Sequence, residues 1–377
     1  YRTKLPLMTI THPEMMDDVT NSMVDIYKKQ GFLPIWHLWG CETGCMVGSP
    51  GIIAVAAAVV KGIEGVNPEE AWEAIYASCM HDIRGGKHRK VYGYMPNDLV
   101  AESIGHDMEF AIADAAAYEV SKMLGKEEAE YLEQRIHSWL NYFDPTVGYP
   151  RGKSSKGEWR EDFNPFNASR INNEYCEGNA WQYLWLVPHD LDKLVECFGG
   201  VEQTIEKLDG LFTAEEKMEG EDVTPDISGL IGQYVHGNEP SHHIIYFYTM
   251  LGEPWKAADR LYEVMDTMYS TEVDGLSGNE DVGQMSAWYV MTTLGFYPVE
   301  PASGKYVLGV PMVDKAEIDV QGGVFTIVRE GYSDENRYVQ SVELNGKALD
   351  RYYITHDEVI AGGKLTFTMG AEKKTWY

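Results

Sequence analysis

The feature of this sequence that most constrains its fold is a change of hydrophobic pattern near residue 305. Before that point apolar residues recur at helical spacing, and each helical segment ends at Gly, Pro or an Asn-rich stretch. After it, short β-branched runs alternate with Gly-Gly and Asn-Gly turns. The sequence therefore predicts a mainly helical domain over residues 1–304 and a small antiparallel β domain over residues 305–377.

The helical stripes and their end signals predict individual helices in the first region. Leu261, Val264 and Met268, for example, share one face of a helix. No sequence repeat typical of a helical solenoid is present, and a region of about ten to twelve helices suits a closed α/α toroid. The predicted helices are Pro13–Gln30, Pro68–His81, Glu102–Leu124, Glu127–Tyr142, Ala180–Phe198, Val201–Leu211, Ser241–Leu251, Pro254–Tyr269 and Gln284–Leu294.

The predicted strands of the second region are short and separated by strong turn signals. Gly322-Gly323, Asn345-Gly346 and Gly362-Gly363 mark the turns. The strands are Tyr306–Leu308, Ala316–Val320, Val324–Val328, Val339–Leu344 and Leu365–Met369.

Composition excludes several classes of function. The 377 residues carry a formal net charge of −28 and no block of Lys or Arg, so nucleic acid is not an expected partner. No apolar run approaches the roughly 20 residues of a membrane span, since the longest candidate, Gly51–Val60, stops at Lys61. The five cysteines do not form a disulfide framework, and Cys41-x3-Cys45 without a second pair is a poor zinc signature.

Two of the loops between the helices are rich in aromatic residues and acids. In the first, Trp36 and Trp39 lie close to Glu42, and a flat indole beside a carboxylate suits a sugar ring. An ordinary packed Trp loop is the alternative. In the second, Glu177 lies between Tyr175 and Trp181, which would raise the pKa of a carboxyl as a general acid requires. The alternative is an acid that stabilises a helix start.

Two further loops combine acids with amides. Asn238, Glu239 and backbone carbonyls in a loop constrained by Gly and Pro suit calcium, whereas the nearby histidines would also suit zinc or simply cap a helix. Asn279 and Asp281 lie between glycines just before a helix, where a solvated acidic turn is the alternative. Glycosidases need two carboxylates facing each other, and Glu177 and Asp281 can supply them.

These segments together resemble the calcium-dependent α-mannosidases of glycoside hydrolase family ninety-two over nearly the whole chain. Gly93-Tyr-Met-Pro96 and Trp39-Gly-x-Glu42 add to four longer motifs in the right order. The four are Tyr175-Cys-Glu-Gly-Asn-Ala-Trp-Gln-Tyr183, His236-Gly-Asn-Glu-Pro-Ser-His-His243, Gly278-Asn-Glu-Asp-Val-Gly-Gln-Met-Ser-Ala-Trp-Tyr289 and Gly295-Phe-Tyr-Pro-Val299. The resemblance implies an (α/α)6 barrel followed by a β region, and hydrolysis of terminal α-linked mannose, α-1,2 linked in the first instance.

The resemblance also assigns roles to residues. Glu177 matches the general acid and Asp281 the general base of an inverting enzyme, whose two carboxyls stand roughly 6.5–9.5 Å apart. Asn279 stands where relatives often have a second carboxylate, so it would orient water or sugar but cannot act as a base. The implied calcium ligands are Gln233 through its carbonyl, Asn238 and Glu239, and the implied sugar-binding residues are Arg2, Trp36, Trp39, Glu42, His236 and His242.

Some implications concern the surroundings of the chain. The family normally has a β-sandwich upstream of the barrel that contributes to the substrate cleft, and its members are secreted, periplasmic or displayed on the cell surface. Relatives that cleave mannose phosphodiesters carry Gln at the acid position, so Glu177 disfavours that subclass. Two other functions stay open from the residues: a mannan-binding protein without catalysis, and a calcium-stabilised interaction module. The density of Trp, His and acid in the loops disfavours the module.

Overall fold

The computed structural model describes residues 1–377, which form two compact units. The helical unit comprises residues 17–241, and the mixed unit joins residues 1–16 to residues 242–377. The predicted boundary near residue 305 lies inside the mixed unit, at the residue where strand β8 (Lys305–Leu308) begins. That residues 1–304 act as one catalytic domain stays a prediction.

The helical unit is dominated by α-helices, whose starts and ends follow the sequence signals. Asn67 caps α4 by accepting from the backbone N–H groups of Glu69 and Glu70, while Pro68 occupies the first helical position. The helices are α2 (Pro13–Gln30), α3 (Pro50–Val60), α4 (Pro68–Cys79), α5 (Gly86–Tyr92), α6 (Ser103–Leu124), α7 (Ala129–Ile136), α8 (Ala180–Tyr183), α9 (Leu191–Phe198) and α10 (Val201–Thr213).

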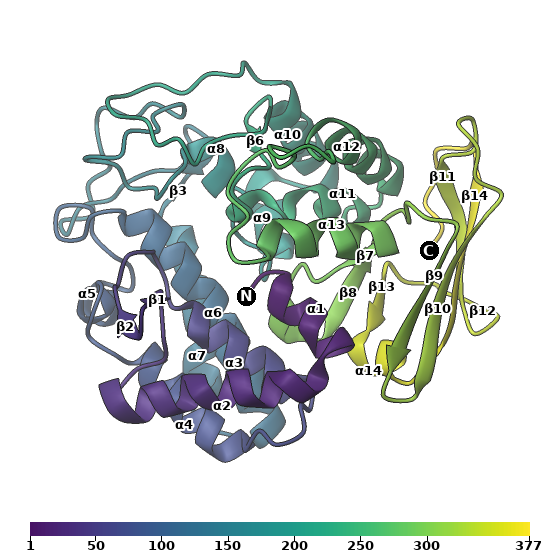
Figure 1. The fold of residues 1–377 in the computed structure, drawn as a ribbon. Helices are drawn as coiled ribbons and strands as arrows, with labels where there is room; N and C mark the ends of the chain where they lie inside the picture. The colour runs from purple at the N-terminus through teal and green to yellow at the C-terminus, as the bar shows by residue number, and fades with distance from the viewer. The chain divides into compact units, whose positions relative to one another are not determined.

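The core of the helical unit is built around α3 and α6, which pack side by side (Figure 1). The apolar run Gly51–Val59 is buried throughout, because α3 is apolar on every face and is surrounded by protein. Helices α4 and α7 pack against α6. The longest apolar run of the sequence is therefore a core helix.

The predicted helix over residues 180–198 is wrong in its middle. Helix α8 ends at Tyr183 and α9 begins only at Leu191. Pro188 lies between them, and its missing N–H and its clash with the preceding residue disfavour a continuous helix. The segments predicted as Glu127–Tyr142 and Ser241–Leu251 are likewise divided, each into a 3-10 turn and a shorter α-helix: η1 (Ser138–Asn141) follows α7, and η3 (Ile244–Tyr246) precedes α11 (Phe247–Met250).

Long loops of the helical unit carry three short hairpins: β1 (His37–Leu38) with β2 (Cys41–Glu42), β3 (Phe143–Asp144) with β4 (Tyr149–Pro150), and β5 (Leu230–Ile231) with β6 (Tyr234–Val235). The 3-10 turn η2 (Glu239–Ser241) closes the unit. The first and third hairpins lie in loops that the sequence singled out.

The mixed unit begins with α1 (Lys4–Thr11), which packs against α13 (Gln284–Leu294) although the two are far apart in sequence (Figure 1). Helix α12 (Pro254–Thr267) packs against α11. The rings of Tyr246 and Tyr297 stack with their centroids 4.7 Å apart. The Trp288 side chain, on α13, is fully buried.

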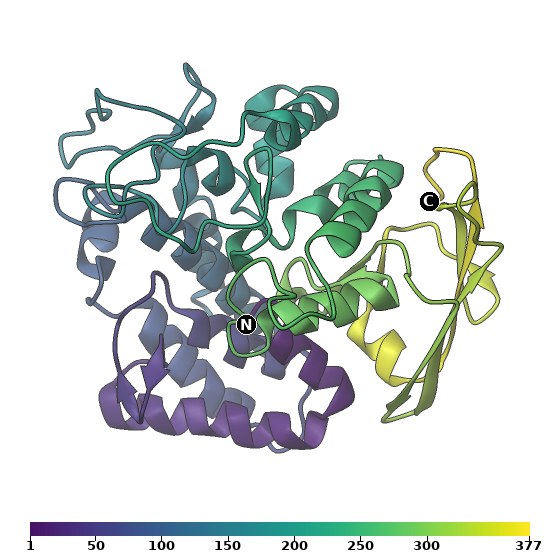
Figure 2. The same ribbon diagram turned by 45° about the horizontal axis from the view of Figure 1, so that its top comes forward.

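The predicted β-rich segment forms two sheets. Strands β13 (Tyr353–Thr355), β8 and β7 (Phe296–Tyr297) form one, followed by α14 (His356–Ile360). The other has the order β12-β11-β14-β10-β9 and appears as the yellow-green layer in Figure 2. Its strands are β9 (Lys315–Val320), β10 (Gly323–Glu330), β11 (Tyr338–Leu344), β12 (Lys347–Ala348) and β14 (Gly363–Gly370).

The expectation that this region is purely antiparallel is corrected by one strand pair. Strands β10 and β14 run parallel, with Phe325 opposite Gly363. The chain between them contains β11 to β13 and α14, which is long enough for the crossover that a parallel pair needs. The Asn345-Gly346 turn is as predicted, since φ is 53° at Asn345 and 75° at Gly346, as a type I′ hairpin requires.

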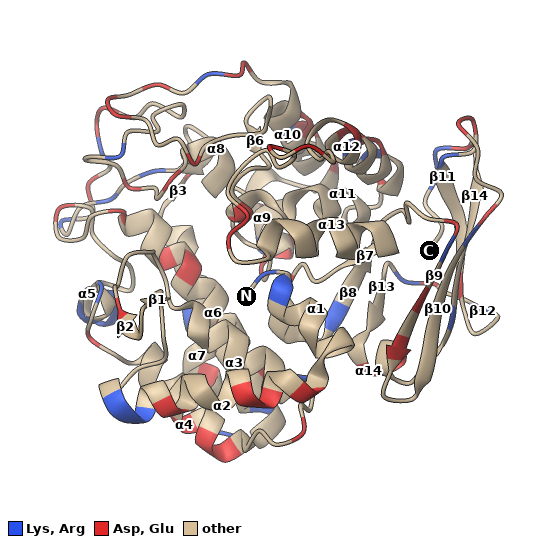
Figure 3. Ribbon diagram, in the orientation of Figure 1, with Lys and Arg blue, Asp and Glu red and all other residues tan.

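Charge is unevenly distributed over the elements. Acidic side chains are spread over α2, α4 and α6, whereas α5 carries mostly basic ones (Figure 3). No helix in the structure combines the length and the apolar character that a membrane crossing requires.

Candidate active site

Glu177 lies in a tight loop immediately before α8. Its φ of 49° is in the left-handed region, which costs free energy for a residue other than Gly. Asn179 caps α8 through a reciprocal pair of bonds with Gln182 and the helix backbone. Because the cap is Asn179, Glu177 is not the residue that caps this helix start.

The amide of Asn238 holds Glu177 in place. Its Nδ2 donates to the Glu177 main-chain oxygen and to Glu177 Oε2, both at 3.2 Å. Asn238 is buried, while Glu177 is partly exposed. The loop that was predicted to bind metal is thus directly bonded to the predicted acid.

The surroundings of Glu177 favour its protonated form. Burial, followed by the negative charge of Asp226, raises its pKa to about 7, and Glu239 and Glu102 act in the same direction. The bond from Asn238 opposes the rise without cancelling it. A carboxyl that keeps its proton near neutral pH is what general acid catalysis requires.

Gln233 connects three segments of the helical unit. Its carbonyl accepts from Gln182 Nε2 at 2.7 Å, and its Oε1 accepts from Asn179 Nδ2 at 3.0 Å. Its own Nε2 donates to the carbonyls of Glu215 and Lys217. The side chain is therefore fully used in joining the β5–β6 turn to the start of α8.

The groups around Glu177 suit a hard cation in charge and in donor type. The main electrostatic influences on its pKa come from the carboxylates Asp226, Glu239 and Glu102, and the loop adds the Asn238 amide and the Gln233 carbonyl. No cluster of three or more His, Cys, Asp or Glu side chains in the structure is arranged to hold a metal. The oxygen-rich set fits calcium better than the predicted zinc alternative.

The two histidines predicted to bind sugar are both fully buried. His236, in the helical unit, bonds through Nδ1 to the Tyr234 hydroxyl at 2.8 Å and stacks on that ring. His242, in the mixed unit, bonds through Nδ1 to Gln284 Nε2 at 2.9 Å. In each histidine, Nδ1 is engaged by a neighbouring side chain of the protein.

The Trp loop is a two-stranded hairpin with an exposed tip. Trp39 and Gly40 form the two-residue turn between β1 and β2, with φ of 54° and 78°. The Trp39 side chain is 96% exposed, and Trp36 is 42% exposed. The alternative of an ordinary packed Trp loop does not describe Trp39, whose ring is left free of the core.

Glu42 organises this hairpin from within. Its carboxylate accepts from the backbone N–H groups of Ile35, Trp36 and Gly44, at 2.7, 3.1 and 2.8 Å. Burial alone would raise the pKa of Glu42, yet the three donors outweigh burial and hold the pKa below its ordinary value. The structure thus gives Glu42 a loop-stabilising role, and its predicted contact with sugar stays a prediction.

Asp281 lies in a strained loop of the mixed unit, directly before α13. Asp281, Val282 and Gly283 have φ of 51°, 56° and 102° in succession. A left-handed conformation is costly for the β-branched Val282. Asp281 and Asn279 are exposed, whereas Glu280 is partly exposed and accepts from the N–H and the hydroxyl of Ser286.

A buried network ties the first residues of the chain to α13. Gln284 accepts from the Thr3 N–H at 3.0 Å and donates to Thr3 Oγ1 at 2.9 Å, in addition to its bond with His242. Arg2 is buried, and its guanidinium lies over the Tyr1 ring. Arg2 and His242 are therefore held in one unit with Asp281, whereas Glu177, Asn238 and Glu239 lie in the other.

Two residues near Glu177 were missed by sequence reasoning, namely Glu102 and Asp226. Both influence its pKa. Glu102 lies just before α6 and adopts a φ of 50°. Only this backbone conformation distinguishes Glu102 from other acidic residues, and a sequence does not show it. Asp226 follows Pro225 in a polar loop without any motif.

Comparison with known proteins assigns the chain to a family of glycoside hydrolases. The family model described as the glycosyl hydrolase family 92 catalytic domain matches residues 1–371. The chain belongs to this family. Its fold class is accordingly the expected one, an (α/α)6 barrel followed by a C-terminal β region.

Three relatives illustrate the similarity. A family 92 α-mannosidase of Bacteroides thetaiotaomicron, solved with mannoimidazole, is 36% identical with a TM-score of 0.93, over 99% of this chain and 50% of that one. An inverting mannosidase of the same family and species is 33% identical with a TM-score of 0.88, and the match covers 98% of this chain and 52% of that one. A protein of Arthroderma benhamiae described as a secreted glycosidase is 28% identical, and the match covers 94% of this chain and 49% of that protein. The chain spans about half the length of these relatives.

Proposed function

We propose that the protein is an inverting exo-α-mannosidase that hydrolyses terminal α-linked mannose, with α-1,2 linkages in N-glycans or mannans as the first substrates to test. The observation that carries this proposal is the partly buried carboxyl of Glu177, held by Asn238 and protonated up to about pH 7. Family membership supports the substrate class, because two of the relatives are described as mannosidases.

Glu177 would act as the general acid. Its proton passes to the glycosidic oxygen as the bond from that oxygen to the anomeric carbon breaks, and the leaving sugar departs as an alcohol. The raised pKa keeps the proton available near neutral pH, and Asn238 directs one carboxyl oxygen. After the reaction the carboxylate takes up a proton from solvent.

Asp281 would act as the general base. It would accept a proton from a water molecule whose oxygen attacks the anomeric carbon, so that the configuration inverts. The left-handed run at Asp281 and Val282 supports this role, because strained, exposed carboxylates persist mainly where function requires them. Asn279, also exposed, would orient the water or the sugar.

Calcium would be held by Asn238, Glu239 and the Gln233 carbonyl. When bound, it would polarise and orient mannose hydroxyls. Asn238 would then connect the cation site to the acid, since its Nδ2 is committed to Glu177 and its oxygen is the part left for a cation.

The substrate would be a mannose-containing glycan outside the cytoplasm. The description of the fungal relative as secreted supports a secreted, periplasmic or cell-surface location. An upstream β-sandwich that completes the cleft is part of the proposal, since the relatives are about twice as long as this chain.

The deciding experiment incubates the full natural protein with α-linked mannobioses, with calcium and with excess chelator, and measures released mannose. Release that depends on calcium and is lost in Glu177→Gln supports the proposal. Binding of mannobiose without any cleavage would instead establish a non-catalytic mannan-binding protein.

A further inference from the structure

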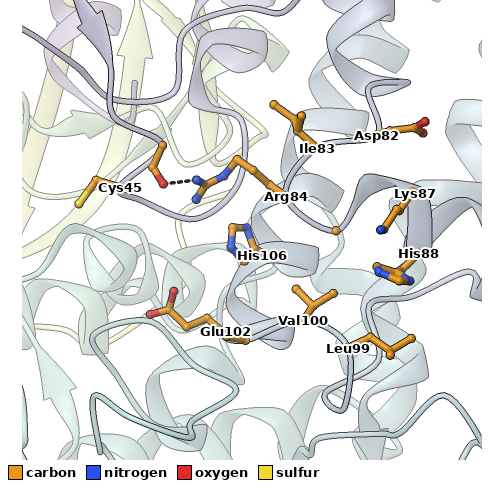
Figure 4. Close-up of a pocket in the computed structure, with 13 residues that line it drawn as sticks. Cys45, Asp82, Ile83, Arg84, Lys87, His88, Leu99, Val100, Glu102 and His106 are labelled. Carbon is orange, nitrogen blue, oxygen red and sulfur yellow. Dashed lines mark hydrogen bonds between the residues drawn. The ribbon is translucent and has the colours of Figure 1, made fainter.

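One pocket of the helical unit belongs to the surroundings of the candidate acid. Its volume is about 590 Å³, and Arg84, Glu102 and His106 are among its lining residues (Figure 4). Because Glu102 also acts electrostatically on Glu177, this pocket is part of the site described above.

A second pocket lies between the end of α5 and the segment formed by α7 and η1, and we call it the α5–α7 pocket. Its volume is about 320 Å³, at the lower end of the range of small-ligand sites, which suits a ligand the size of one sugar ring. None of the residues assigned above to catalysis, calcium or sugar binding lines it. The α5–α7 pocket is therefore distinct from the candidate active site.

A buried network of charged side chains forms the floor of the α5–α7 pocket. Arg89, which is 5% exposed, is ion-paired with Asp107 and Asp114 of α6. Its guanidinium also donates to Ser138 Oγ at 2.8 Å. Arg135 is bonded to the same Asp114 at 3.0 Å. Because protein groups hold each of these side chains, the floor keeps its shape without a ligand.

The basic residues of the lining are balanced by acids of the protein. The two arginines share the two buried carboxylates of α6. Lys90 is paired with Asp82. His137 Nδ1 lies 2.7 Å from Asp190 Oδ2. An anion would therefore find little uncompensated positive charge here, in a chain whose formal net charge is −28, and the balance favours a neutral ligand.

The groups left for a ligand are an aromatic ring and uncharged amides. The Tyr131 side chain is 40% exposed, and Gln134, three residues later, lies on the same face of α7 and carries both donors and an acceptor. Asn141 uses Nδ2 for the carbonyls of Gly93 and Ser138, which leaves Oδ1 as an acceptor. An exposed ring beside uncharged donors and acceptors suits a sugar, whose apolar face stacks on the ring while its hydroxyls bond to the amides.

Helix α6 connects the α5–α7 pocket with the loop of the candidate acid. At the start of α6, the N–H of Gly105 donates at 2.9 Å to the carbonyl of Glu174, three residues before Glu177. Further along the same helix, Asp114 holds Arg89 of the pocket. Pocket and acid loop are thus mounted on one helix, so their spacing is fixed and one long glycan chain can occupy both.

We propose that the α5–α7 pocket is a second, non-catalytic binding site for a neutral hexose unit of a glycan, with Tyr131 stacking on the sugar and Gln134 and Asn141 bonding to its hydroxyls. The inference rests on the proposed function only for the identity of the sugar, mannose. A mannan chain bound in both places would be held more tightly than at either site alone. Mannobiose, whose two sugars lie on either side of the bond that breaks, has no further unit for the pocket.

Binding is measured by electrophoresis through gels that contain increasing amounts of α-mannan. The full natural protein carries Glu177→Gln, so that the mannan is not degraded. In this background Tyr131→Ala should raise the Kd for mannan about fivefold, because the stacking ring is lost, and Gln134→Ala should also weaken binding. The matched control is Tyr332→Ala, which removes a ring that is 38% exposed, lies in the mixed unit and does not line the pocket.

Activity is compared on a long and a short substrate with Glu177 intact. Tyr131→Ala should lower kcat/KM for mannan about fivefold, through KM, and leave kcat/KM for α-mannobiose within about twofold. A merely structural role of Tyr131 would lower kcat/KM on both substrates together with the melting temperature.

Three results would overturn the inference: an unchanged Kd in both Tyr131→Ala and Gln134→Ala, an equal loss of binding in Tyr332→Ala, or equal losses of kcat/KM on mannan and mannobiose. If inorganic sulfate, added at constant ionic strength, abolishes the difference in Kd that Tyr131→Ala makes, the pocket binds anions and the inference also fails.

The proposed function is judged by a separate result. If the unmodified protein cleaves neither mannan nor mannobiose with calcium present, that function fails, whereas mannan binding that depends on Tyr131 still supports the second site. A protein that cleaves both substrates, with no effect of Tyr131→Ala on either binding or cleavage of mannan, retains the function and loses only the second site.

Discussion

Asn238 Nδ2 donates at 3.2 Å both to the main-chain oxygen and to the carboxylate Oε2 of Glu177. One amide thus fixes the backbone and the side chain of the candidate acid together. Because Asn238 is also a proposed calcium ligand, a cation at that loop would help to orient Glu177 indirectly. Acid and cation site are therefore expected to respond together when either is altered.

The role of Glu177 is tested by the dependence of rate on the leaving group. Glu177→Gln should lower kcat on mannobiose by about 10²–10⁴-fold, because the alcohol leaving group needs a proton. A mannoside with an acidic phenol leaving group needs little protonation and should retain most of its rate. Initial rates of sugar release on both substrates give the answer, with Glu202→Gln, an exposed acid of α10, as control. Equal losses on the two substrates would show that Glu177 only holds its loop.

The pKa of Glu177 also predicts a change of stability with pH. Below about pH 4.5 the group is protonated in the folded and the unfolded chain and contributes nothing. Between pH 4.5 and about 7 the unfolded chain loses the proton first, so the free energy of unfolding falls as pH rises. The loss is at most about 3 kcal/mol.

Glu177→Gln should remove this fall in the free energy of unfolding with rising pH, because Gln does not titrate. In the presence of chelator, the variant should melt at a higher temperature than the unmodified protein at pH 8 and at nearly the same temperature at pH 4. Calorimetry at both pH values measures the difference, and Glu202→Gln should show no such pH dependence. A variant that is less stable at pH 8 would mean that the Glu177 carboxylate is favourably paired in the folded state.

Most helices and strands were predictable because their signals are local. Asn67 before Pro68 starts α4, and Asn345-Gly346 forms the predicted turn. Pro188 was visible in the sequence, yet a pattern of apolar residues on both sides of it suggested one continuous helix. The parallel pairing of β10 with β14 was not predictable, because partner choice depends on the path of the whole β region.

The candidate site was predictable to a different extent. Glu177 and Asn238 belong to motifs that can be recognised, but the bond between them joins residues 61 positions apart. The loop around Glu42 has the composition of a sugar-binding site. Only the structure shows that the Glu42 carboxylate accepts hydrogen bonds from three backbone N–H groups. Glu102 lies near Glu177 through tertiary packing and carries no local signal.

Calcium dependence is tested by binding as well as by rate. Activity of the full natural protein should be lost in excess chelator and regained with calcium better than with zinc, because the proposed ligands are oxygens. Glu239→Gln should weaken calcium binding in calorimetric titration by about tenfold, since one negative charge is removed from the site. Glu221→Gln changes an exposed acid of the same unit and should leave binding unchanged. Full activity in excess chelator would contradict the assignment.

The exposed tip of the β1–β2 hairpin should affect substrate binding and not folding. Trp39 is 96% exposed, so Trp39→Ala should leave the melting temperature unchanged. If its ring stacks on sugar, KM for a mannan oligosaccharide should rise about fivefold. Leu38→Ala is the control because it removes another exposed hydrophobic side chain, 47% exposed, from the neighbouring position of the same hairpin. An unchanged KM in Trp39→Ala would remove Trp39 from the sugar-binding residues.

The stereochemistry of the first product decides whether Asp281 is a base or a nucleophile. A base activates water for a single displacement, so an α-mannoside must give β-mannose first. A nucleophile would form a covalent sugar ester, and its hydrolysis would return α-mannose. Proton NMR of early reaction mixtures distinguishes the two anomers before they interconvert. Asp281→Asn should lose activity about 10²–10⁴-fold, because no other group then activates the water. The matched control is Asp274→Asn, which should stay active. Asp274 is, like Asp281, an exposed acid of the mixed unit, but it lacks the left-handed backbone of Asp281. Early α-mannose would reverse the assignment and make Asp281 the nucleophile of a retaining enzyme.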